Sequence, residues 1–242
     1  MPTLLEVERV SRSFGGVAAN VDVSFTVQAG EIVGLIGPNG AGKTTLFNMI
    51  AGEIAPQSGV IRLDGAVVCG RGPLAAARAG IARTFQVVRS FDTMTVLENV
   101  MVGAFAHAHR TRTAMAEAAA VIGATGLAAH ADTPAASLTP PGKRRLEVAR
   151  ALAMRPRLLL LDEMLTGLTP AEAQEGVAMI RALRAQGITI LMVEHVMEVL
   201  LPLIDRAVVL DLGRVLTVGT PAAVVRDPGV IRAYLGERYA AA

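Results

Sequence analysis

A glycine-rich loop of fixed spacing is the feature that most constrains how this chain can fold. Its residues are Gly37, Pro38, Asn39, Gly40, Ala41, Gly42, Lys43, Thr44 and Thr45. An apolar run over residues 31–36 comes before the loop, and apolar residues recur at helical spacing over residues 43–51 after it. We therefore expect the loop to connect a buried strand to a helix.

This arrangement predicts a site for a nucleoside triphosphate. Glycines let backbone N–H groups converge on phosphate oxygens, and the positive end of the following helix adds to the attraction. We expect Lys43 to reach the β- and γ-phosphates and the Thr44 hydroxyl to bind magnesium. Only two of the 23 basic residues are lysines, Lys43 and Lys143. A compact ammonium fits a phosphate cradle better than a broad guanidinium does.

A second candidate site, which is acidic, follows four leucines at residues 158–161. The chain continues there with Asp162 and Glu163. The run predicts a buried strand with two carboxylates at its end. Asp162 is expected to hold magnesium, usually through water. Glu163 is expected to point at the γ-phosphate and polarise the attacking water. The loop alone fits kinases, GTPases, recombination motors and ABC ATPases, and the acidic pair narrows this choice.

The order of the expected elements indicates an α/β fold. Expected strands cover residues 4–10, 21–27, 31–36, 60–64, 158–162, 189–193, 206–211 and 214–218, and expected helices cover residues 43–51, 96–105, 113–122, 141–154 and 171–185. Strands that alternate with helices predict a mainly parallel sheet with helices on both faces. The antiparallel strands at both ends of the chain predict a mixed β-subdomain beside that sheet.

Composition limits the remaining classes. The 23 basic and 21 acidic residues are scattered along the chain, so we expect no nucleic-acid partner. The single cysteine, Cys69, excludes an internal disulfide and fits a reducing compartment. No apolar stretch approaches the roughly 20 residues that span a bilayer. No secretory signal is expected either, and the sequence therefore predicts a cytoplasmic chain.

Further motifs, in this order along the chain, resemble the ABC ATPase family over nearly the whole sequence. They are Phe14, the loop at residues 37–45, Arg-Thr-Phe-Gln at residues 83–86, residues 138–152, the acidic pair, Thr-Gly-Leu-Thr at residues 166–169 and Val-Glu-His at residues 193–195. The resemblance implies a P-loop NTPase core, with ATP and Mg²⁺ as cofactors. It also implies an antiparallel β-subdomain and an inserted α-helical subdomain.

The resemblance further assigns roles to individual residues. Gln86 takes the Q-loop position, which senses magnesium and the attacking water, and His195 takes the H-loop position, which contacts the γ-phosphate. Glu163, His195 and Gln86 would then be catalytic, while Thr44, Gln86 and Asp162 would hold the metal. Phe14 takes the position of the aromatic residue that stacks on adenine, although an ordinary core residue is the alternative. The D-loop would consist of Thr166, Gly167, Leu168 and Thr169.

The chain departs from the family in its signature. Where the family reads Leu-Ser-Gly-Gly-Gln, residues 138–142 read Leu-Thr-Pro-Pro-Gly. The two prolines remove N–H donors near an expected phosphate contact. Thr139 keeps a hydroxyl and Gly142 an N–H, so these two residues are expected to contact the ATP bound by the opposite subunit. Met164 replaces the usual proline, and Thr169 the usual D-loop aspartate.

Within the family, several segments are similar to ATP-binding subunits of importers for branched-chain or hydrophobic amino acids. They are residues 14–17, 83–86, 94–100, 144–147, 167–170 and 230–236. The resemblance implies membrane permeases, a solute-binding protein and a second ATPase subunit, or a second copy of this chain. It places the chain peripherally on the cytoplasmic face of the inner (plasma) membrane. Related systems carry urea, amides or aromatic acids, so the cargo stays open.

Two other functions fit the sequence less well than import. A soluble ABC protein of DNA repair or translation is disfavoured, because such proteins usually carry coiled-coil insertions or two tandem ATPase domains. A regulatory subunit that does not hydrolyse ATP is disfavoured by the intact site residues.

The resemblance also predicts how the chain is organised. Residues 1–242 would form one ABC ATPase domain, in which residues 1–86 and 156–242 form the catalytic core with its β-subdomain. Residues 87–155 would form the α-helical subdomain that carries the signature. Contact with the membrane partner is expected around Gln86 and residues 87–98, where Phe91, Met94 and Val96 are apolar. The alternative is that these three side chains pack inside the helical subdomain.

Overall fold

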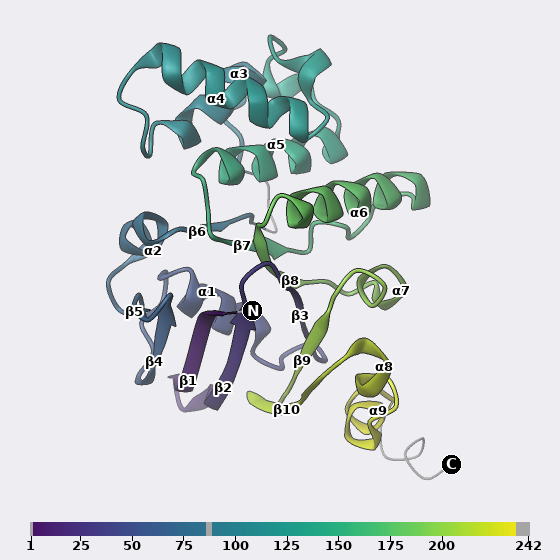
Figure 1. Ribbon diagram of the computed structural model, residues 1–242. Helices are drawn as coiled ribbons and strands as arrows, with labels where there is room; N and C mark the ends of the chain where they lie inside the picture. Colours follow the sequence, from purple (N-terminus) through teal and green to yellow (C-terminus); the bar gives the residue numbers. More distant parts are fainter. Residues whose placement is uncertain (1, 86–88, 236–242) are drawn as a thin grey trace.

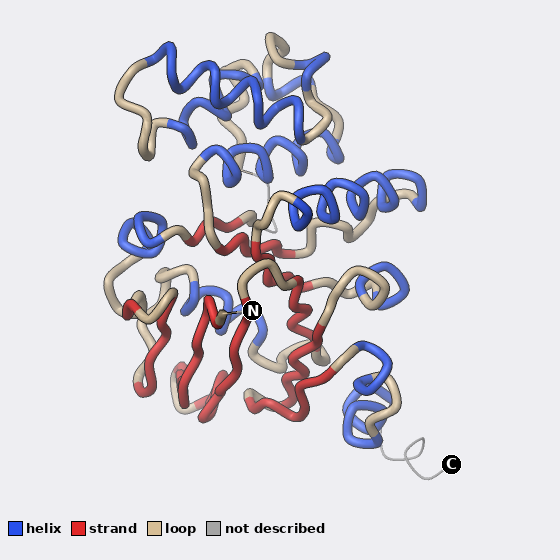
Figure 2. The backbone as a smooth tube through the Cα atoms, in the orientation of Figure 1, coloured by secondary structure: helices blue, strands red, loops and turns tan. Residues whose placement is uncertain are grey.

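A six-stranded sheet forms the centre of the computed structural model, which describes residues 2–85 and 89–235 (Figures 1 and 2). In spatial order its strands are β10 (Arg214–Gly219), β9 (Arg206–Asp211), β3 (Ile32–Ile36), β8 (Thr189–Val193), β7 (Leu158–Asp162) and β6 (Ile81–Arg83). The strands from β9 to β6 are parallel, and β10 pairs antiparallel with β9 at one edge. The expected mainly parallel sheet is therefore confirmed.

Both faces of this sheet are buried, which explains the uninterrupted apolar runs in its strands. Every residue of β3, β7 and β8 is buried. Leu158 and Leu160 face a core shared with α1 (Lys43–Ile50), whereas Leu159 and Leu161 face a core shared with α6 (Pro170–Ala185). Burial of one leucine contributes about 1.5–3 kcal/mol. The four leucines thus anchor the strand that ends in Asp162.

A second, antiparallel sheet packs on the α1 side. Its strands, in order, are β2 (Val17–Gln28), β1 (Thr3–Phe14), β4 (Ser58–Leu63) and β5 (Ala66–Val67). The C-terminal hairpin does not belong to this sheet, so the expectation that the antiparallel strands of both chain ends share one subdomain was wrong. The reason is that β9 pairs in parallel with β3, and its buried residues 207–210 need cover on both faces.

Three of the remaining helices form a group with a core of its own. The remaining helices are α2 (Pro73–Ala79), α3 (Val96–Ala104), α4 (Thr111–Ala124), α5 (Pro140–Ala153), α7 (Met197–Leu200), α8 (Pro221–Val224) and α9 (Pro228–Leu235), with 3-10 turns at Ala128–His130 and Ala135–Ser137. Helices α3, α4 and α5 pack around a third core, at the end of the molecule far from the antiparallel sheet (Figure 1). Val96 is fully buried in this core, whereas Phe91 is 44% exposed. Val96 therefore packs inside the helical subdomain, as the alternative predicts, whereas the role of the exposed Phe91 stays a prediction.

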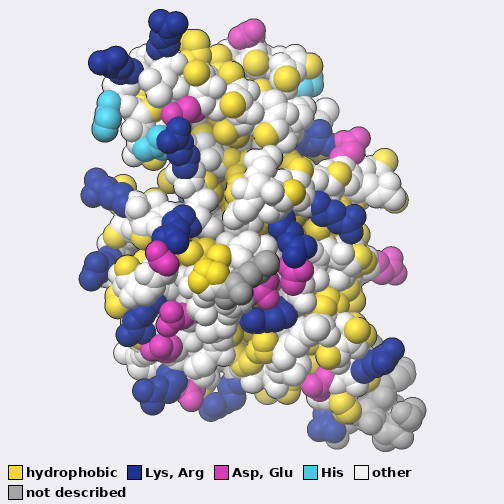
Figure 3. Space-filling view, viewed as in Figure 1, with side chains coloured by type: hydrophobic (Ala, Val, Ile, Leu, Met, Phe, Trp, Pro, Cys, Tyr) yellow, Lys and Arg dark blue, Asp and Glu magenta, His cyan; other side chains and the backbone are white. Residues whose placement is uncertain are grey.

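The surface carries both signs of charge. On the face that Figure 3 shows, basic and acidic side chains are interspersed. Among the described residues, no helix has both the length and the apolar character that crossing a membrane requires.

Candidate nucleotide-binding and hydrolysis site

The loop of residues 37–42 joins β3 to α1, and its shape depends on glycine. Gly37 and Gly42 have φ values of 152° and 96°. A Cβ atom at Gly37 would lie 2.1 Å from the carbonyl oxygen of Leu210, and one at Gly42 would lie 2.2 Å from that of Ala19. Helix α1 starts at Lys43 without a side-chain cap. The first helical hydrogen bond is the one that the Leu46 N–H donates to the Gly42 carbonyl, so the N–H groups of residues 43–45 have no intrahelical partner.

Lys43 is turned inward over the loop. Its Nζ donates to the carbonyl oxygens of Gly37 at 2.7 Å and Pro38 at 2.9 Å. Burial lowers the pKa of Lys43, and the negative charge of Glu163 opposes that shift. Thr44, the next residue, is exposed, so its hydroxyl is accessible at the start of the helix. The loop therefore presents an ammonium, a hydroxyl and helix N–H groups in one place.

The acidic pair follows β7 directly. The Asp162 carboxylate accepts a 2.7 Å hydrogen bond from Nη2 of Arg83, and its backbone N–H donates to the Thr84 hydroxyl. The Arg83 side chain is 9% exposed, and it also contacts Asn48 and Glu53. The side chain of Arg83, the last residue of β6, therefore orients the Asp162 carboxylate.

Glu163 and His195 form a close pair. Asp162 is the register partner of Val193 on β8, so the residues that follow the two strands emerge side by side. Nε2 of His195 lies 2.7 Å from Oε1 of Glu163. Glu163 has a positive φ of 49°, which is uncommon for a residue with a side chain, and its N–H donates to the carbonyl of Val193. The fold thus brings together two groups that lie far apart in the sequence.

The expected D-loop runs from this pair to α6. The Thr166 hydroxyl donates to the Glu194 carboxylate at 3.2 Å, and Gly167 has a positive φ of 73°. Leu168 packs against the core on the α6 side. Thr169 is the N-cap of α6 and forms a capping box with Glu172. Threonine can replace aspartate at this position because either side chain caps a helix.

The altered signature forms the start of α5. Pro140 and Pro141 occupy the first helical turn, and the N-cap Thr139 accepts a 3.3 Å hydrogen bond from the Gly142 N–H. Proline is well tolerated there because the N–H that it lacks would have no helical partner. The Gly142 N–H, expected to be available to phosphate, is already engaged within this chain. Thr139 and Gly142 line a cavity of 250 Å³ to which none of residues 37–45 contributes.

Of the other expected site residues, Phe14 can be placed and Gln86 lies outside the described residues. Phe14 is 44% exposed at the turn between β1 and β2, with the guanidinium of Arg12 4.8 Å from the centre of its ring. The alternative that it is an ordinary core residue is therefore wrong.

Sequence reasoning assigned no role to four polar residues that surround the site. They are Arg83, Thr84, Arg144 and Glu194. Each lies inside or beside a motif segment, which is the only signal that the sequence carries. Their partners are fixed by contacts between distant elements and become visible only in the folded chain.

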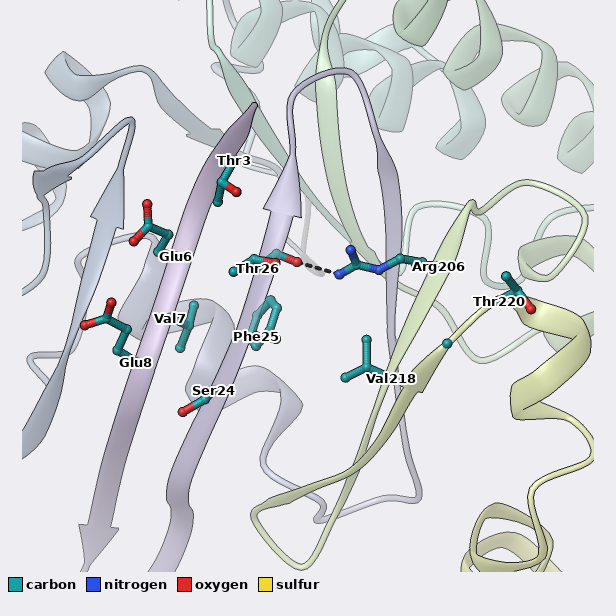
Figure 4. Close-up of a pocket in the computed structure, with 11 residues that line it drawn as sticks. Thr3, Glu6, Val7, Glu8, Ser24, Phe25, Thr26, Arg206, Val218 and Thr220 are labelled. Carbon is teal, nitrogen blue, oxygen red and sulfur yellow. Dashed lines mark hydrogen bonds between the residues drawn. The ribbon is translucent and has the colours of Figure 1, made fainter. Parts of the chain in front are cut away.

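A cavity between the two sheets lies away from the candidate site. It measures 970 Å³ and lies between β1, β2 and β10, and none of the expected site residues lines it. Figure 4 shows Arg206 reaching across it from β9 to the Thr26 carbonyl, a hydrogen bond of 2.7 Å. The size of this cavity therefore does not locate the chemistry expected at residues 37–45.

Comparison with known proteins gives the class to which this fold and site belong. Residues 21–166 match the ABC transporter family. The chain belongs to the ATP-binding cassettes of ABC transporters, which hydrolyse ATP. Residues 214–240 also match the family described as branched-chain amino acid ATP-binding cassette transporter.

Individual relatives agree with this assignment over almost the full length. The chain is 39% identical to the high-affinity branched-chain amino acid transport ATP-binding protein BraF of Pseudomonas aeruginosa, covering 97% of this chain and 98% of that protein. It is 41% identical to LivG of Escherichia coli, with the same coverage. A solved ATP-binding cassette of an ABC transporter in its ADP conformation has a TM-score of 0.89 at 28% identity, covering 98% of this chain and 100% of that one.

Proposed function

We propose that this chain powers the uptake of branched-chain amino acids, or of a related small solute, through separate membrane permeases. The observation that carries the proposal is the gathering of Lys43, Glu163 and His195 at the carboxyl ends of β3, β7 and β8. This is the edge of a parallel sheet at which α/β proteins bind their ligands. The C-terminal match at residues 214–240 and the names of the relatives support the choice of cargo.

The residues at the loop fit ATP and Mg²⁺. A Cβ atom at Gly42 would fill space beside the loop, so its backbone can approach phosphates closely. Thr44 and Asp162 offer a hydroxyl and a carboxylate, the hard oxygen ligands that Mg²⁺ prefers, and Gln86 would join them. Bound Mg²⁺ would neutralise charge that develops on the phosphates. Phe14 would stack on the adenine, and residues 37–45 would surround the phosphates.

Hydrolysis requires a water molecule aimed at the γ-phosphate. Glu163 would accept a proton from that water as general base, since its carboxylate lies at the edge where the loop opens. His195, at 2.7 Å from Glu163, would orient the carboxylate and donate toward the γ-phosphate. Lys43, whose ammonium now contacts the carbonyls of Gly37 and Pro38, would pair with the phosphates instead. Each role belongs to a residue of this chain.

The complete machine would need a second ATPase subunit, either a different chain or a second copy of this one. Thr139 and Gly142 would then face ATP on the opposite subunit, beside residues 166–169 of the D-loop. Residues 87–155 would act as an α-helical subdomain between the core (1–86 and 156–242) and the membrane. We place the assembly on the cytoplasmic face of the inner membrane, with a solute-binding protein outside. No nucleic acid takes part.

A groove between the core and the three-helix group is the proposed contact for the permease. Its volume is 490 Å³, and its lining includes Phe85, Phe105 and Glu147. Phe91 lies nearby with the guanidinium of Arg150 4.7 Å from its ring centre, and its ring is 44% exposed. An exposed aromatic residue beside a groove is typical of a protein contact.

The docking role of Phe91 can be tested by charge. We expect Phe91→Glu to reduce transport by about tenfold, because a carboxylate would be desolvated in the interface, while basal phosphate release stays unchanged. Leu74→Glu on α2, which changes another exposed side chain in the same way, is the control and should transport normally. Loss of transport and basal hydrolysis together, with a lower melting temperature, would show that Phe91 serves packing instead.

The function itself is tested by uptake in the host. Deleting the gene should lower uptake of radiolabelled leucine, isoleucine and valine at micromolar concentration. The wild-type gene should restore uptake, and a gene encoding Lys43→Ala should not. Unchanged amino-acid uptake together with reduced uptake of urea or an aromatic acid would reject the proposed cargo and leave the transport role standing. Unchanged uptake of every solute would reject the transport role.

A further inference from the structure

Glu194 is a buried carboxylate whose two oxygens bind the segment that follows Glu163. Oε1 accepts a 2.6 Å hydrogen bond from the Leu165 N–H, and Oε2 accepts one of 3.2 Å from the Thr166 hydroxyl. Only 1% of Glu194 is exposed. A buried carboxylate needs such hydrogen-bond donors, because burying a charged group without them costs free energy. Glu194 therefore has a fixed position and a fixed pair of partners.

The same segment is bound on its carbonyl side by α5. Nη1 of Arg144 donates to the carbonyl of Met164 at 3.2 Å and also to the carbonyl of Thr166. The Glu194 carboxylate thus accepts hydrogen bonds from an N–H and a hydroxyl of residues 164–166. The Arg144 guanidinium donates to two carbonyls of the same residues. The segment of residues 164–166, which includes the start of the D-loop, is therefore bound both by α5 and by the residue that follows β8.

The backbone of Glu163 explains why such fixing is needed. Its φ of 49° lies in the left-handed region, which a non-glycine residue adopts only when its surroundings hold it there. The N–H of Glu163 bonds to Val193, and the N–H two residues later bonds to Glu194. His195, the partner of Glu163, directly follows Glu194 in the chain. The Glu194 side chain therefore connects the residue before His195 to the residue two positions after Glu163.

We propose that Glu194 is a positioning residue for hydrolysis: its carboxylate fixes residues 165 and 166 to the end of β8 and so keeps the Glu163 carboxylate aimed at its target beside His195. This inference rests on the proposed roles of Glu163 and His195. Glu194 touches neither nucleotide nor water in this scheme and acts through Glu163. Its effect should therefore appear in turnover and leave nucleotide affinity unchanged.

The test compares two substitutions of Glu194 in the full-length chain. Glu194→Ala removes both acceptors, and we expect kcat for phosphate release to fall about 100-fold, the cost typical of a small misplacement of a reacting group. KM for ATP and the affinity for a fluorescent ATP analogue should change less than about twofold, since the loop at residues 37–45 is untouched. Glu194→Gln should retain activity within about threefold, because its amide can accept from Leu165 and donate to Thr166. Glu198→Ala, an exposed neighbour on α7, is the control.

Two further variants guard against a simple folding defect. Thr166→Val removes only the hydroxyl partner of Glu194, and we expect it to lower kcat about threefold with unchanged nucleotide affinity. Combining Glu194→Ala with Glu163→Gln should add no loss beyond that of Glu163→Gln alone, because residues that act as one unit are not additive. If Glu194→Ala keeps the wild-type kcat, or if Glu194→Gln is as damaging as alanine, the positioning role is wrong. Additive losses in the double variant would likewise overturn it.

The failure of this inference can be told apart from failure of the proposed function. Wild-type turnover in Glu163→Gln alone would remove Glu163 from the chemistry and reject the proposed function, whatever Glu194 does. A strong effect of Glu163→Gln, combined with no effect of Glu194→Ala, would reject only the positioning role.

Discussion

Two helix N-termini of this chain, those of α1 and α5, belong to the motifs expected to contact ATP, and they are built in opposite ways. Helix α1 begins after Gly42 with no side-chain cap, and Lys43 and Thr44 open its first turn. Helix α5 begins with Pro140 and Pro141, and the next N–H, that of Gly142, donates to the Thr139 hydroxyl. One end offers N–H groups and a cation, whereas the other has satisfied or removed its donors.

The difference teaches that a helix N-terminus attracts an anion only when its donors are left open. Both helices have a macrodipole with its positive end at the N-terminus. Most of the effect of this dipole at short range comes from unsatisfied N–H groups. Glu172 and Glu175 also line the cavity at the start of α5, together with Arg145, which forms an ion pair with Glu175. We therefore expect two unequal ATP sites when the chain pairs with another ATPase subunit. The site built on Lys43 and Glu163 should be the fast one.

The open end is tested most strongly by removing its cation. We expect Lys43→Ala to abolish tight ATP binding, because the loop would lose the ammonium that faces three anionic phosphates. Titration with a fluorescent nucleotide should show affinity reduced by at least about 100-fold, the equivalent of roughly 3 kcal/mol. Lys143→Ala, the other lysine of the chain, is the control. An unchanged dissociation constant would reject the assignment of the loop.

The inequality of the two sites is tested by the general base. Glu163→Gln keeps the shape of the side chain but cannot accept the proton of the attacking water, so turnover should fall by about 100-fold or more while ATP stays bound. His195→Ala should show a milder loss. In the assembled pair, the equivalent substitution in the partner subunit should cost far less. Equal losses in steady-state phosphate release would mean that the prolines are harmless.

Much of the nucleotide site could be predicted from sequence, because phosphate chemistry demands particular residues at local spacing. Residues 37–45 and the pair Asp162 and Glu163 follow from backbone N–H groups, hydroxyls and carboxylates that lie next to one another in the chain. The parallel core was equally accessible, since β3, β7 and β8 are short apolar runs that alternate with helices. Local patterns were sufficient to predict these segments, because the geometry of each is local.

The features that sequence did not predict depend on distant contacts. Strand β6 has only three residues, too few for a periodic pattern, and it is fixed by pairing with β7. Strands β9 and β10 were predicted, but their place in the parallel sheet depends on the pairing of β9 with β3. Glu194 belongs to a motif segment, yet its partner Leu165 lies 29 residues away. Nothing in a linear pattern states which carboxylate meets which N–H.

Restoring donors at α5 should raise the activity of the weak site. The double substitution Pro140→Gly and Pro141→Gly adds two N–H groups to the first turn, and one well-placed donor can be worth tenfold or more. The measurement is phosphate release by the pair of this chain with its partner ATPase subunit, in which this chain also carries Glu163→Gln. Only the ATP bound by the partner, which the start of α5 is expected to contact, is then hydrolysed. We expect an increase of about tenfold over the same pair with prolines. Unchanged release would mean that these positions do not face the phosphate.

The smallest expected effect concerns the cap of α5. Thr139→Ala removes the acceptor for the Gly142 N–H and should cost about 1 kcal/mol of stability, or roughly 2–4 °C in melting temperature for a chain of this size. Thr220 caps α8 with the same geometry, a 3.3 Å bond from the Ala223 N–H, so Thr220→Ala is a matched control. Both variants should lose stability. The two variants are then compared in a pair in which this chain also carries Glu163→Gln, so that only the opposite site hydrolyses ATP. There we expect Thr139→Ala, but not Thr220→Ala, to slow phosphate release, because only Thr139 is expected to face the ATP of the opposite subunit. Equal turnover in the two variants would make Thr139 a cap alone, and would leave the start of α5 without any side-chain contact to nucleotide.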